Sequence, residues 1–206
     1  MEKIYYYPVW IRVWHLINAI MCLLLIATGV SMQYSSIENP LIPFDRAVAI
    51  HNIGGIALTI NYLIFFIGNL IFVNGSHYKI QWHGLGTRLM NQFTYYSFKI
   101  FKKENPPYPV NKQRKFNPLQ QFSYVLIMYG FVPALFVTGW ILLFPGIVVN
   151  DLLGSKGLFI TDLLHVIAGF IVSLFMIVHI YFCTIGHTVT SNFKSMITGF
   201  HEIHDK

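Results

Sequence analysis

Residues Leu163–Ile185 read LLHVIAGFIVSLFMIVHIYFCTI, and this stretch decides the fold. It contains no Asp, Glu, Lys or Arg. An apolar run of about 20 residues can cross a ~30 Å hydrocarbon layer as an α-helix that satisfies every backbone polar group internally. Two histidines interrupt the run, His165 and His179, which lie 14 positions apart. Because this spacing is just under four helical turns, both side chains project from nearly the same face, about 21 Å apart along the axis.

Three further apolar runs share this character, and the four together predict an all-α integral membrane four-helix bundle. We place the spans at about Val13–Met32, Ala49–Val73, Phe122–Phe144 and Leu163–Ile185, and none of them contains a charged residue. Of the 206 residues 55% are apolar and only 11% are charged, against about 25% charged in an average soluble domain. We therefore expect one transmembrane domain over residues 1–206, with no separate soluble domain.

The positive charges are distributed unequally between the two sides of the predicted bundle. Of the 14 Lys and Arg residues, only Arg46 and Lys156 fall in the first and third loops. Since positive residues are retained in the cytoplasm, we expect a multi-pass membrane protein with both termini and a loop of about 74–117 on the cytoplasmic side. The net charge of +6 would then face anionic membrane lipid. A nucleic-acid role for the basic segment Lys112–Lys115 is disfavoured because it lies between two spans.

The loop of about 74–117 is long for a simple connection. Leu89, Phe93, Tyr96 and Ile100 fall on one helical stripe within it, with basic residues nearby. This pattern is typical of a helix that lies in the membrane interface, and a loop collapsed on the bundle is an equal alternative.

Four of the nine histidines lie in the predicted spans, and they form two pairs by depth. With cytoplasmic termini, His15 and His179 lie near the inner ends of the first and fourth spans. His51 and His165 begin the second and fourth spans at the outer side. A lone histidine in a membrane helix more often bonds to a neighbouring helix, but four histidines at two matched depths indicate two cofactors stacked across the bilayer.

Haem iron fits this arrangement better than zinc does. Zinc prefers four clustered ligands, commonly including Cys or carboxylate, whereas these histidines are split between two depths. Two histidines fill both axial positions of a haem iron, which leaves no position for oxygen activation and favours simple electron transfer. Small residues near the histidines either make room for a flat ring or permit close helix packing. They are Gly54, Gly55, Ala168 and Gly169, together with Gly29 and Gly139 in the similar phrases IATGV and FVTGW.

The remaining histidines and the cysteines carry less information. His77, His83 and His187 lie near the inner interface, where they could contact haem propionates or a quinone or could simply reach toward the interface. His201 and His204 belong to the segment HEIHD, which we expect to be a solvated terminus. Two cysteines inside the spans, Cys22 and Cys183, are most simply core residues and offer no iron–sulfur or covalent haem motif.

Beyond these patterns, the sequence resembles the four-helix di-haem b-type cytochrome subunits of bacterial respiratory enzymes such as nickel-iron hydrogenase, formate dehydrogenase and thiosulfate reductase. The resemblance covers nearly the whole chain. It rests on RVWHLIN at Arg12–Asn18, HNIGG at His51–Gly55, KFNPLQQFSY at Lys115–Tyr124, and the two spaced histidines of the fourth span. It implies that His15 and His179 bind the inner of two haem b groups and that His51 and His165 bind the outer one, the same pairs that depth gives.

The resemblance also implies a quinone site and a partner. Members of that family exchange electrons between a quinone near the inner haem and a catalytic or electron-transfer subunit, iron–sulfur or multihaem, on the outer face. Asn117 and Gln120 match positions close to the quinone, and Asn18 lies one turn beyond His15. By local chemistry alone Asn117 is equally well explained as a helix N-cap before Pro118.

Three functions are compatible with the sequence. The leading one is an electron-transfer subunit of a quinone-linked oxidoreductase complex, rather than a complete enzyme. The second is a stand-alone di-haem oxidoreductase that acts on superoxide or a metal ion at the outer haem. The third is a haem-free helical anchor or transporter.

Overall fold

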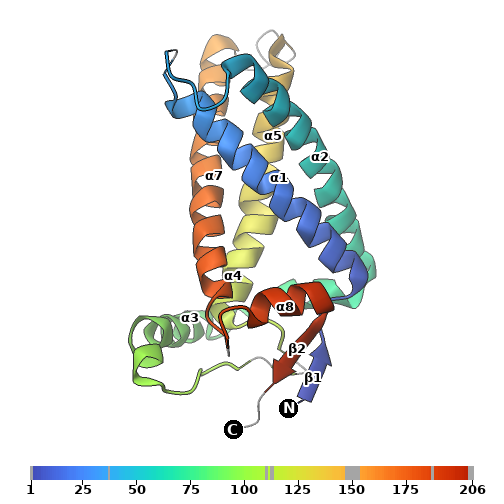
Figure 1. Cartoon of the computed structure of the whole chain (residues 1–206), viewed down its shortest axis with the longest axis vertical. Helices are drawn as coiled ribbons and strands as arrows, with labels where there is room; N and C mark the ends of the chain where they lie inside the picture. Colours follow the sequence, from blue (N-terminus) through green and yellow to red (C-terminus); the bar gives the residue numbers. More distant parts are fainter. Residues whose placement is uncertain are drawn as a thin grey trace.

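The fold is that of a computed structural model, which describes residues 2–36, 38–109, 111, 114–146, 154–186 and 188–203. Four long helices run the length of the molecule (Figure 1). They are α1 (Val9–Tyr34), α2 (Phe44–Ile71), the continuous span of α4 (Pro118–Leu126), η4 (Ile127–Phe131) and α5 (Val132–Leu143), and α7 (Gly154–Cys183). All four spans are long and apolar enough to cross a membrane. The predicted all-α integral membrane four-helix bundle is therefore confirmed.

Each helix begins several residues before the predicted span. Its first turns carry polar or charged residues, such as Arg12 in α1 and Asp45 in α2, which a search for purely apolar runs excludes. One consequence corrects the sequence analysis. His51 and His165 do not begin their helices but lie inside them, because α2 begins at Phe44 and α7 begins at Gly154.

The third span is not a regular α-helix throughout. A π-helical segment, η4, separates α4 from α5 and ends just before Pro133. Proline lacks a backbone N–H and its ring clashes with the preceding turn. A wider turn at this point lets the helix continue without that clash, which keeps the span in one piece.

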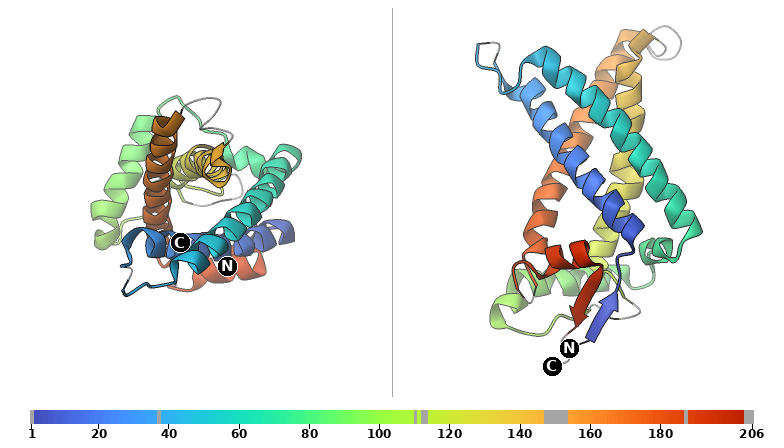
Figure 2. Two further views of the ribbon diagram at one scale, coloured as in Figure 1. Left: turned by 90° about the horizontal axis from the view of Figure 1, so that it is seen from above. Right: turned by 45° about the vertical axis from the view of Figure 1, so that its right-hand side comes forward.

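The four spans pack as two pairs, α1 with α2 and α5 with α7 (Figure 2). Two reciprocal hydrogen bonds join α1 to α2: Trp14 Nε1 donates to the Asn61 carbonyl at 3.0 Å, and Asn61 Nδ2 donates to the Trp14 carbonyl at 3.3 Å. The Trp14 ring also stacks on Phe65 with 4.2 Å between centroids. These contacts belong to one core cluster that links all four spans: Ile11, Trp14, Tyr62, Phe65, Ile127, Val132 and Val172.

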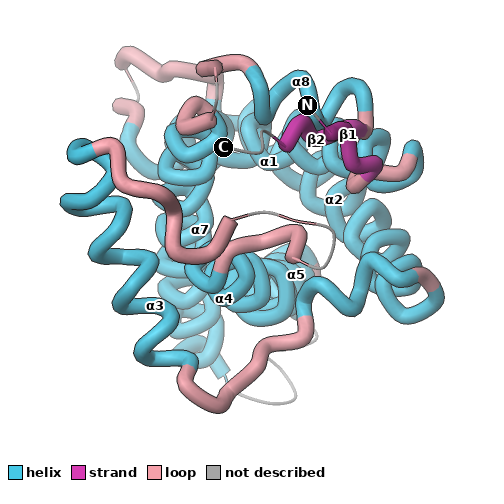
Figure 3. The backbone as a smooth tube through the Cα atoms, turned by 90° about the horizontal axis from the view of Figure 1, so that it is seen from below, coloured by secondary structure: helices cyan, strands magenta, loops and turns pink. Residues whose placement is uncertain are grey.

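Short helices cover the end of the bundle where α2 and α7 finish. They are η1 (Val73–Tyr78), α3 (Leu85–Thr94), η2 (Tyr95–Lys99) and η3 (Ile100–Lys102). Figure 3 shows α3 running across this end beside α4 and α7. The predicted stripe does form a helix, and its Phe93, Tyr96 and Ile100 side chains face α4 and the end of α7 around a shared cavity. The two alternatives for this loop therefore each describe part of it.

Both chain termini lie at this same end, which we call the terminal end (Figure 1). Strand β1 (Glu2–Tyr5) pairs antiparallel with β2 (Phe200–Ile203), and α8 (Ser191–Thr198) precedes β2. Gly199 joins α8 to β2 with φ +88°, and an added Cβ would lie 2.7 Å from the Tyr5 ring. A strand here differs from the solvated terminus that the sequence predicts. His204 lies outside the described residues.

Candidate functional site

The structure brings the four span histidines together in the two pairs that the sequence predicts. At the terminal end, His15 of α1 faces His179 of α7 with 6.3 Å between ring centroids. Toward the opposite end, His51 of α2 faces His165 of α7 with 6.2 Å between centroids. Each pair thus joins a histidine from the α1–α2 half to one from α7, and α7 contributes one histidine to each depth.

A threonine orients each histidine of the opposite-end pair. The Thr28 hydroxyl lies 2.9 Å from His51 Nδ1, and the Thr138 hydroxyl lies 2.8 Å from His165 Nδ1. Each hydroxyl also donates to a backbone carbonyl of its own helix, Leu24 at 2.8 Å and Ala134 at 2.7 Å. A hydroxyl has one hydrogen, so each threonine that donates to its helix must accept from the imidazole.

This arrangement fixes the tautomer of both rings. Nδ1 carries the hydrogen and donates it in a hydrogen bond to the threonine oxygen. Nε2 therefore keeps its lone pair and can bind a metal ion. An axial histidine whose other nitrogen donates to a neighbouring oxygen is the usual pattern at metal sites. In the segments IATGV and FVTGW the threonines are therefore the residues that orient the histidines, and the sequence analysis did not identify them.

The glycines beside these histidines serve two purposes. An added Cβ at Gly139 would lie 3.3 Å from His165 Cε1, and one at Gly29 would lie 3.6 Å from His51 Cε1. These two glycines therefore give room to the imidazole rings rather than to a macrocycle. Gly54, in contrast, is a packing residue, because a Cβ there would meet Leu24 at 3.0 Å.

Gly55 and Gly169 are different, because they border open space. Each lies four residues after a histidine, hence one turn along the same helix face. A Cβ at Gly55 would meet nothing within 4 Å, and one at Gly169 would only touch Leu135 at 4.0 Å. Space beside an oriented imidazole pair is what a flat ring needs.

The residues present fit a haem. A metal–nitrogen bond of about 2 Å on each side requires roughly 4 Å between two ring nitrogens, which facing rings with centroids 6.2 Å apart can provide. Within the described residues, no group of three or more His, Cys, Asp or Glu side chains gathers in one place. A cofactor that supplies its own equatorial nitrogens therefore suits these pairs, and zinc does not.

The terminal-end pair is held differently. The Tyr124 hydroxyl lies 3.4 Å from His179 Nδ1, and Phe175 stacks on the His179 ring with 5.8 Å between centroids. The Cys183 thiol lies 3.8 Å from His179 Nε2. The His15 ring makes no hydrogen bond within the described part of the chain. Asn18 turns away from His15, since its Nδ2 lies 3.7 Å from Cys22 Sγ.

Asn117 and Gln120 cap the start of α4. Asn117 Oδ1 accepts from the Gln120 backbone N–H at 2.9 Å, and Gln120 Oε1 accepts from the Asn117 backbone N–H at 3.2 Å. The capping alternative for Asn117 is therefore confirmed. Its amide nitrogen remains available and donates to the Tyr96 hydroxyl at 2.9 Å. Burial raises the pKa of Tyr96, while hydrogen bonds from Asn117 and Gln92 lower it.

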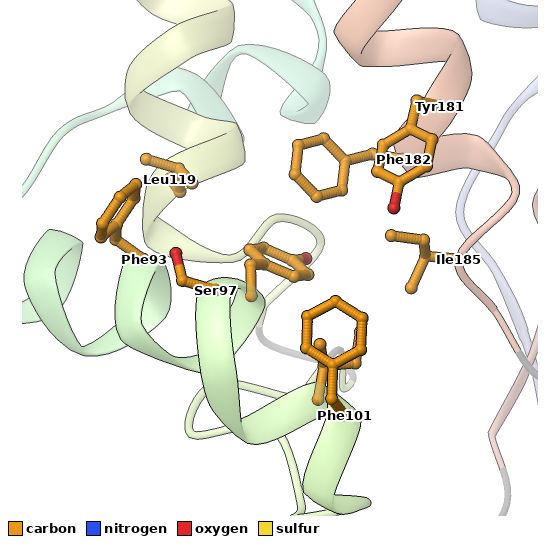
Figure 4. A pocket seen from close by; sticks show the side chains of 9 residues that line it. Phe93, Ser97, Phe101, Leu119, Tyr181, Phe182 and Ile185 are labelled. Carbon is orange, nitrogen blue, oxygen red and sulfur yellow. The ribbon is translucent and has the colours of Figure 1, made fainter.

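Tyr96 lines an apolar cavity of about 480 Å³ between η2, α4 and the end of α7 (Figure 4). Phe182, three residues after His179, is among the lining side chains, and its ring lies 4.6 Å from that of Tyr96. The cavity thus lies next to the helix end that carries His179. Its full lining is Phe93, Tyr96, Ser97, Ile100, Phe101, Leu119, Tyr181, Phe182 and Ile185. Sequence reasoning did not find Tyr96 as a site residue, because only the folded loop brings it to Asn117.

The weaker histidine candidates that the structure describes belong to neither pair. Burial lowers the pKa of His77, as does the nearby Lys115. His201 lies in β2 with its Nδ1 3.4 Å from the Ser195 hydroxyl. His83 is exposed, and His187 lies outside the described residues.

A four-helix membrane bundle with facing histidines on its helices defines a class, that of the membrane b-type cytochromes. A family model described as prokaryotic cytochrome b561 matches residues 6–199. The chain belongs to this prokaryotic cytochrome b561 family. It is also 36% identical over 200 residues to the Escherichia coli (strain K12) protein named "Putative cytochrome YdhU", covering 97% of this chain and 75% of the relative. No solved structure matches the chain.

Family membership gives the general activity and cofactor. The family binds haem b, and this chain is a multi-pass membrane cytochrome that carries electrons. The predicted family is thereby confirmed, and membership in a haem-binding family disfavours the third alternative, a haem-free anchor or transporter.

Proposed function

We propose that this chain carries electrons across a bacterial cytoplasmic membrane, between a quinone at the terminal end and a redox partner at the opposite end. Two haem b groups would form the path. His15 and His179 would hold the inner haem, and His51 and His165 the outer one. The observation that carries the proposal is the pair of facing imidazoles at each of two depths, 6.3 and 6.2 Å between centroids.

The orientation follows from charge. By sequence, 12 of the 14 Lys and Arg residues lie in the two terminal segments and the middle loop, and only Arg46 and Lys156 lie in the other two loops. By the positive-inside rule the terminal end faces the cytoplasm, with both termini. The inner haem then lies on the cytoplasmic side and the outer haem on the external side.

The ligand set favours electron transfer over chemistry at the iron. Haem supplies one-electron exchange when it is bound, and two axial histidines leave its iron no open position. The protein's task is to hold each imidazole neutral and correctly turned, as Thr28 and Thr138 do for the outer pair. Such a chain is an electron-transfer subunit, and we propose an iron–sulfur or multihaem subunit as its partner on the external face.

The apolar cavity beside Phe182 is the proposed quinone site. Its volume of about 480 Å³ lies within the range of small-molecule sites, roughly 300–1,000 Å³. Reduction of a quinone consumes protons as well as electrons, so a site near the cytoplasmic surface needs a proton donor. Tyr96 accepts its hydrogen bond from Asn117 and keeps its own hydrogen for a quinone carbonyl. Asn117 would act as a positioning residue, and Gln120 would hold Asn117 in place.

Haem stoichiometry and spectra test the haem assignment. Two protohaems per chain are expected in the purified protein by the pyridine haemochrome assay. His165→Ala should remove the outer haem alone and His15→Ala the inner one, whereas His201→Ala should leave both. One haem per wild-type chain would refute the two-haem proposal.

The quinone site is tested by separating the two roles of Asn117. Asn117→Asp keeps an oxygen that caps α4 but loses the donor to Tyr96, and Tyr96→Phe removes the hydroxyl itself. Both should slow quinone turnover while both haem spectra stay normal. Gln120→Glu, which preserves the capping pair, is the matched control. Wild-type turnover in both variants would place the quinone elsewhere.

A further inference from the structure

A second cavity lies at the terminal end, apart from the quinone cavity, and it is strongly basic. It has a volume of about 530 Å³ between η1, the segment before α3 and the start of α4. Four cationic side chains line it: Lys79, Arg88, Arg114 and Lys115. No carboxylate lines it, and no carboxylate of the described residues lies within ion-pair distance of these four cations. Such a concentration of positive charge favours the binding of an anion.

Lys115 is the most unusual member of this group. Its side chain is 5% exposed, yet its only hydrogen-bond partner within the described residues is Asn74 Oδ1 at 2.9 Å. The ammonium also lies 4.6 Å from the centre of the Tyr7 ring. Burial lowers the pKa of Lys115 to about 8. A buried ammonium that lacks a counter-charge favours an anion that reaches it.

The other cations are positioned around the opening. Arg88 donates to the backbone carbonyls of Gln81 and His83, which holds this segment at the rim of the cavity. The Arg114 guanidinium lies 5.5 Å from the centre of the Tyr108 ring. An arginine turned toward the cavity can bind two oxygens of a phosphate at once, and lysines add point charges.

The depth of the cavity indicates which anion reaches it. It opens where α2 has ended at Ile71 and α4 begins at Pro118, which is the level of lipid headgroups. Trp82, next to the lining residue Gln81, is 73% exposed, as expected of an aromatic anchor at the membrane interface. The exposed apolar residues Phe72 and Val73 lie where α2 ends and η1 begins, and an acyl chain could follow α2 from there.

We propose that this basic cavity binds the phosphate group of an anionic phospholipid from the cytoplasmic leaflet. Basic pockets beside membrane helices on this side suit such headgroups. The lipid would neutralise Lys115 and hold η1 against the start of α4. The choice of leaflet rests on the proposed orientation, whereas the anion site itself does not depend on the quinone site.

Native mass spectrometry of the purified holoprotein in detergent tests the proposal. Phosphatidylglycerol and phosphatidylcholine of equal chain length are titrated separately. We expect one phosphatidylglycerol to bind more tightly than any phosphatidylcholine. The double variant Lys79→Gln/Arg114→Gln removes two exposed charges without disturbing the interior, and it should bind phosphatidylglycerol about thirtyfold more weakly, from the usual contribution of each basic residue.

A matched control and two further arms complete the test. Lys102→Gln/Lys103→Gln loses the same charge outside the cavity and should bind as the wild type does. Lys115→Met, which removes the buried ammonium, should weaken binding as well. Inorganic phosphate that does not displace the lipid supports a lipid site, whereas inorganic phosphate that binds at the same affinity shows that free phosphate is the ligand and overturns the lipid assignment. Equal binding of both lipids, or equal loss in both double variants, also overturns it.

Discussion

Replacement of Thr28 or Thr138 by valine should change the reduction potential of the outer haem and leave the inner haem unchanged. Valine has nearly the shape of threonine but accepts no hydrogen bond. Both hydroxyls are buried, with Thr28 2% exposed, and each lies within 2.9 Å of an imidazole Nδ1. The His51 ring also bonds to the Leu25 backbone and the His165 ring to the Leu135 backbone, so each valine variant weakens the hydrogen bonding of its imidazole without abolishing it.

The size of the effect follows from the lost hydrogen bond. One intramolecular hydrogen bond contributes about 0.5–1.5 kcal/mol net. When the threonine oxygen accepts a hydrogen bond from Nδ1–H, the imidazole becomes a more basic ligand and favours oxidised iron. Loss of this hydrogen bond should therefore raise the reduction potential of the outer haem. If ~1 kcal/mol of the hydrogen-bond energy differs between the two oxidation states, the shift is ~40 mV for a one-electron couple. Haem affinity should also fall, about 10–100-fold as for other residues behind metal ligands.

Redox titration followed in the haem α-band measures both potentials in one sample. We expect the outer haem to become more positive in Thr28→Val and in Thr138→Val, and to recover in Thr28→Ser, which restores the acceptor. The inner haem provides the internal reference. Unchanged potentials with full haem content in both valine variants would falsify the proposed role of the threonines.

Three further predictions concern packing, charge and topology. Gly139→Ala should lower outer-haem content more than Gly29→Ala, because the new Cβ lies 3.3 Å from the His165 ring instead of 3.6 Å from that of His51; equal losses by haem assay would contradict this. Burial lowers the pKa of Lys115 from 10.5 to about 8. Between about pH 8 and 10.5 the unfolded chain therefore binds one proton more than the folded chain does. The free energy of unfolding of the lipid-free protein should rise with pH through this window, by at most about 3 kcal/mol. Thermal unfolding of Lys115→Met should lack this rise, and a retained rise would assign it to another group. Cysteine at Ser36 should react with an impermeant thiol reagent from outside the cell and cysteine at Lys103 should not; the reverse pattern would invert the proposed orientation.

The features that depend on one helix at a time could be predicted from the sequence. The apolar runs predicted all four spans, and the 14-residue spacing of His165 and His179 predicted one histidine at each depth of α7. The N-cap role of Asn117 could likewise be predicted, because N-cap chemistry is local, whereas the part of Gln120 in the capping box was not identified. Periodicity and local hydrogen bonding are sufficient for such features, since no distant contact decides them.

The features that depend on distant contacts could not be predicted. Tyr96 meets Asn117 only because α3 and η2 turn back across the end of the bundle. From the sequence, Lys115 is one of several cations in a basic loop and is expected at the surface. Its burial beside Asn74 and Tyr7 results from contacts between distant segments. Helix ends were misplaced where charged residues continue a helix beyond the apolar layer, as Arg12 does in α1.

The pairing of β1 with β2 has a consequence for biogenesis. Its register joins Glu2 to Ile203 and Tyr5 to Phe200. Because β2 follows the fourth span in the chain, β1 cannot pair until all four spans have been synthesised. Such a non-local pairing forms late, because the whole intervening chain must be ordered before it can close. Until then α1 is tied to the rest of the bundle mainly through α2. The pairing of the terminal strands is therefore expected to be a late step, which joins the two ends of the chain after the four spans have packed.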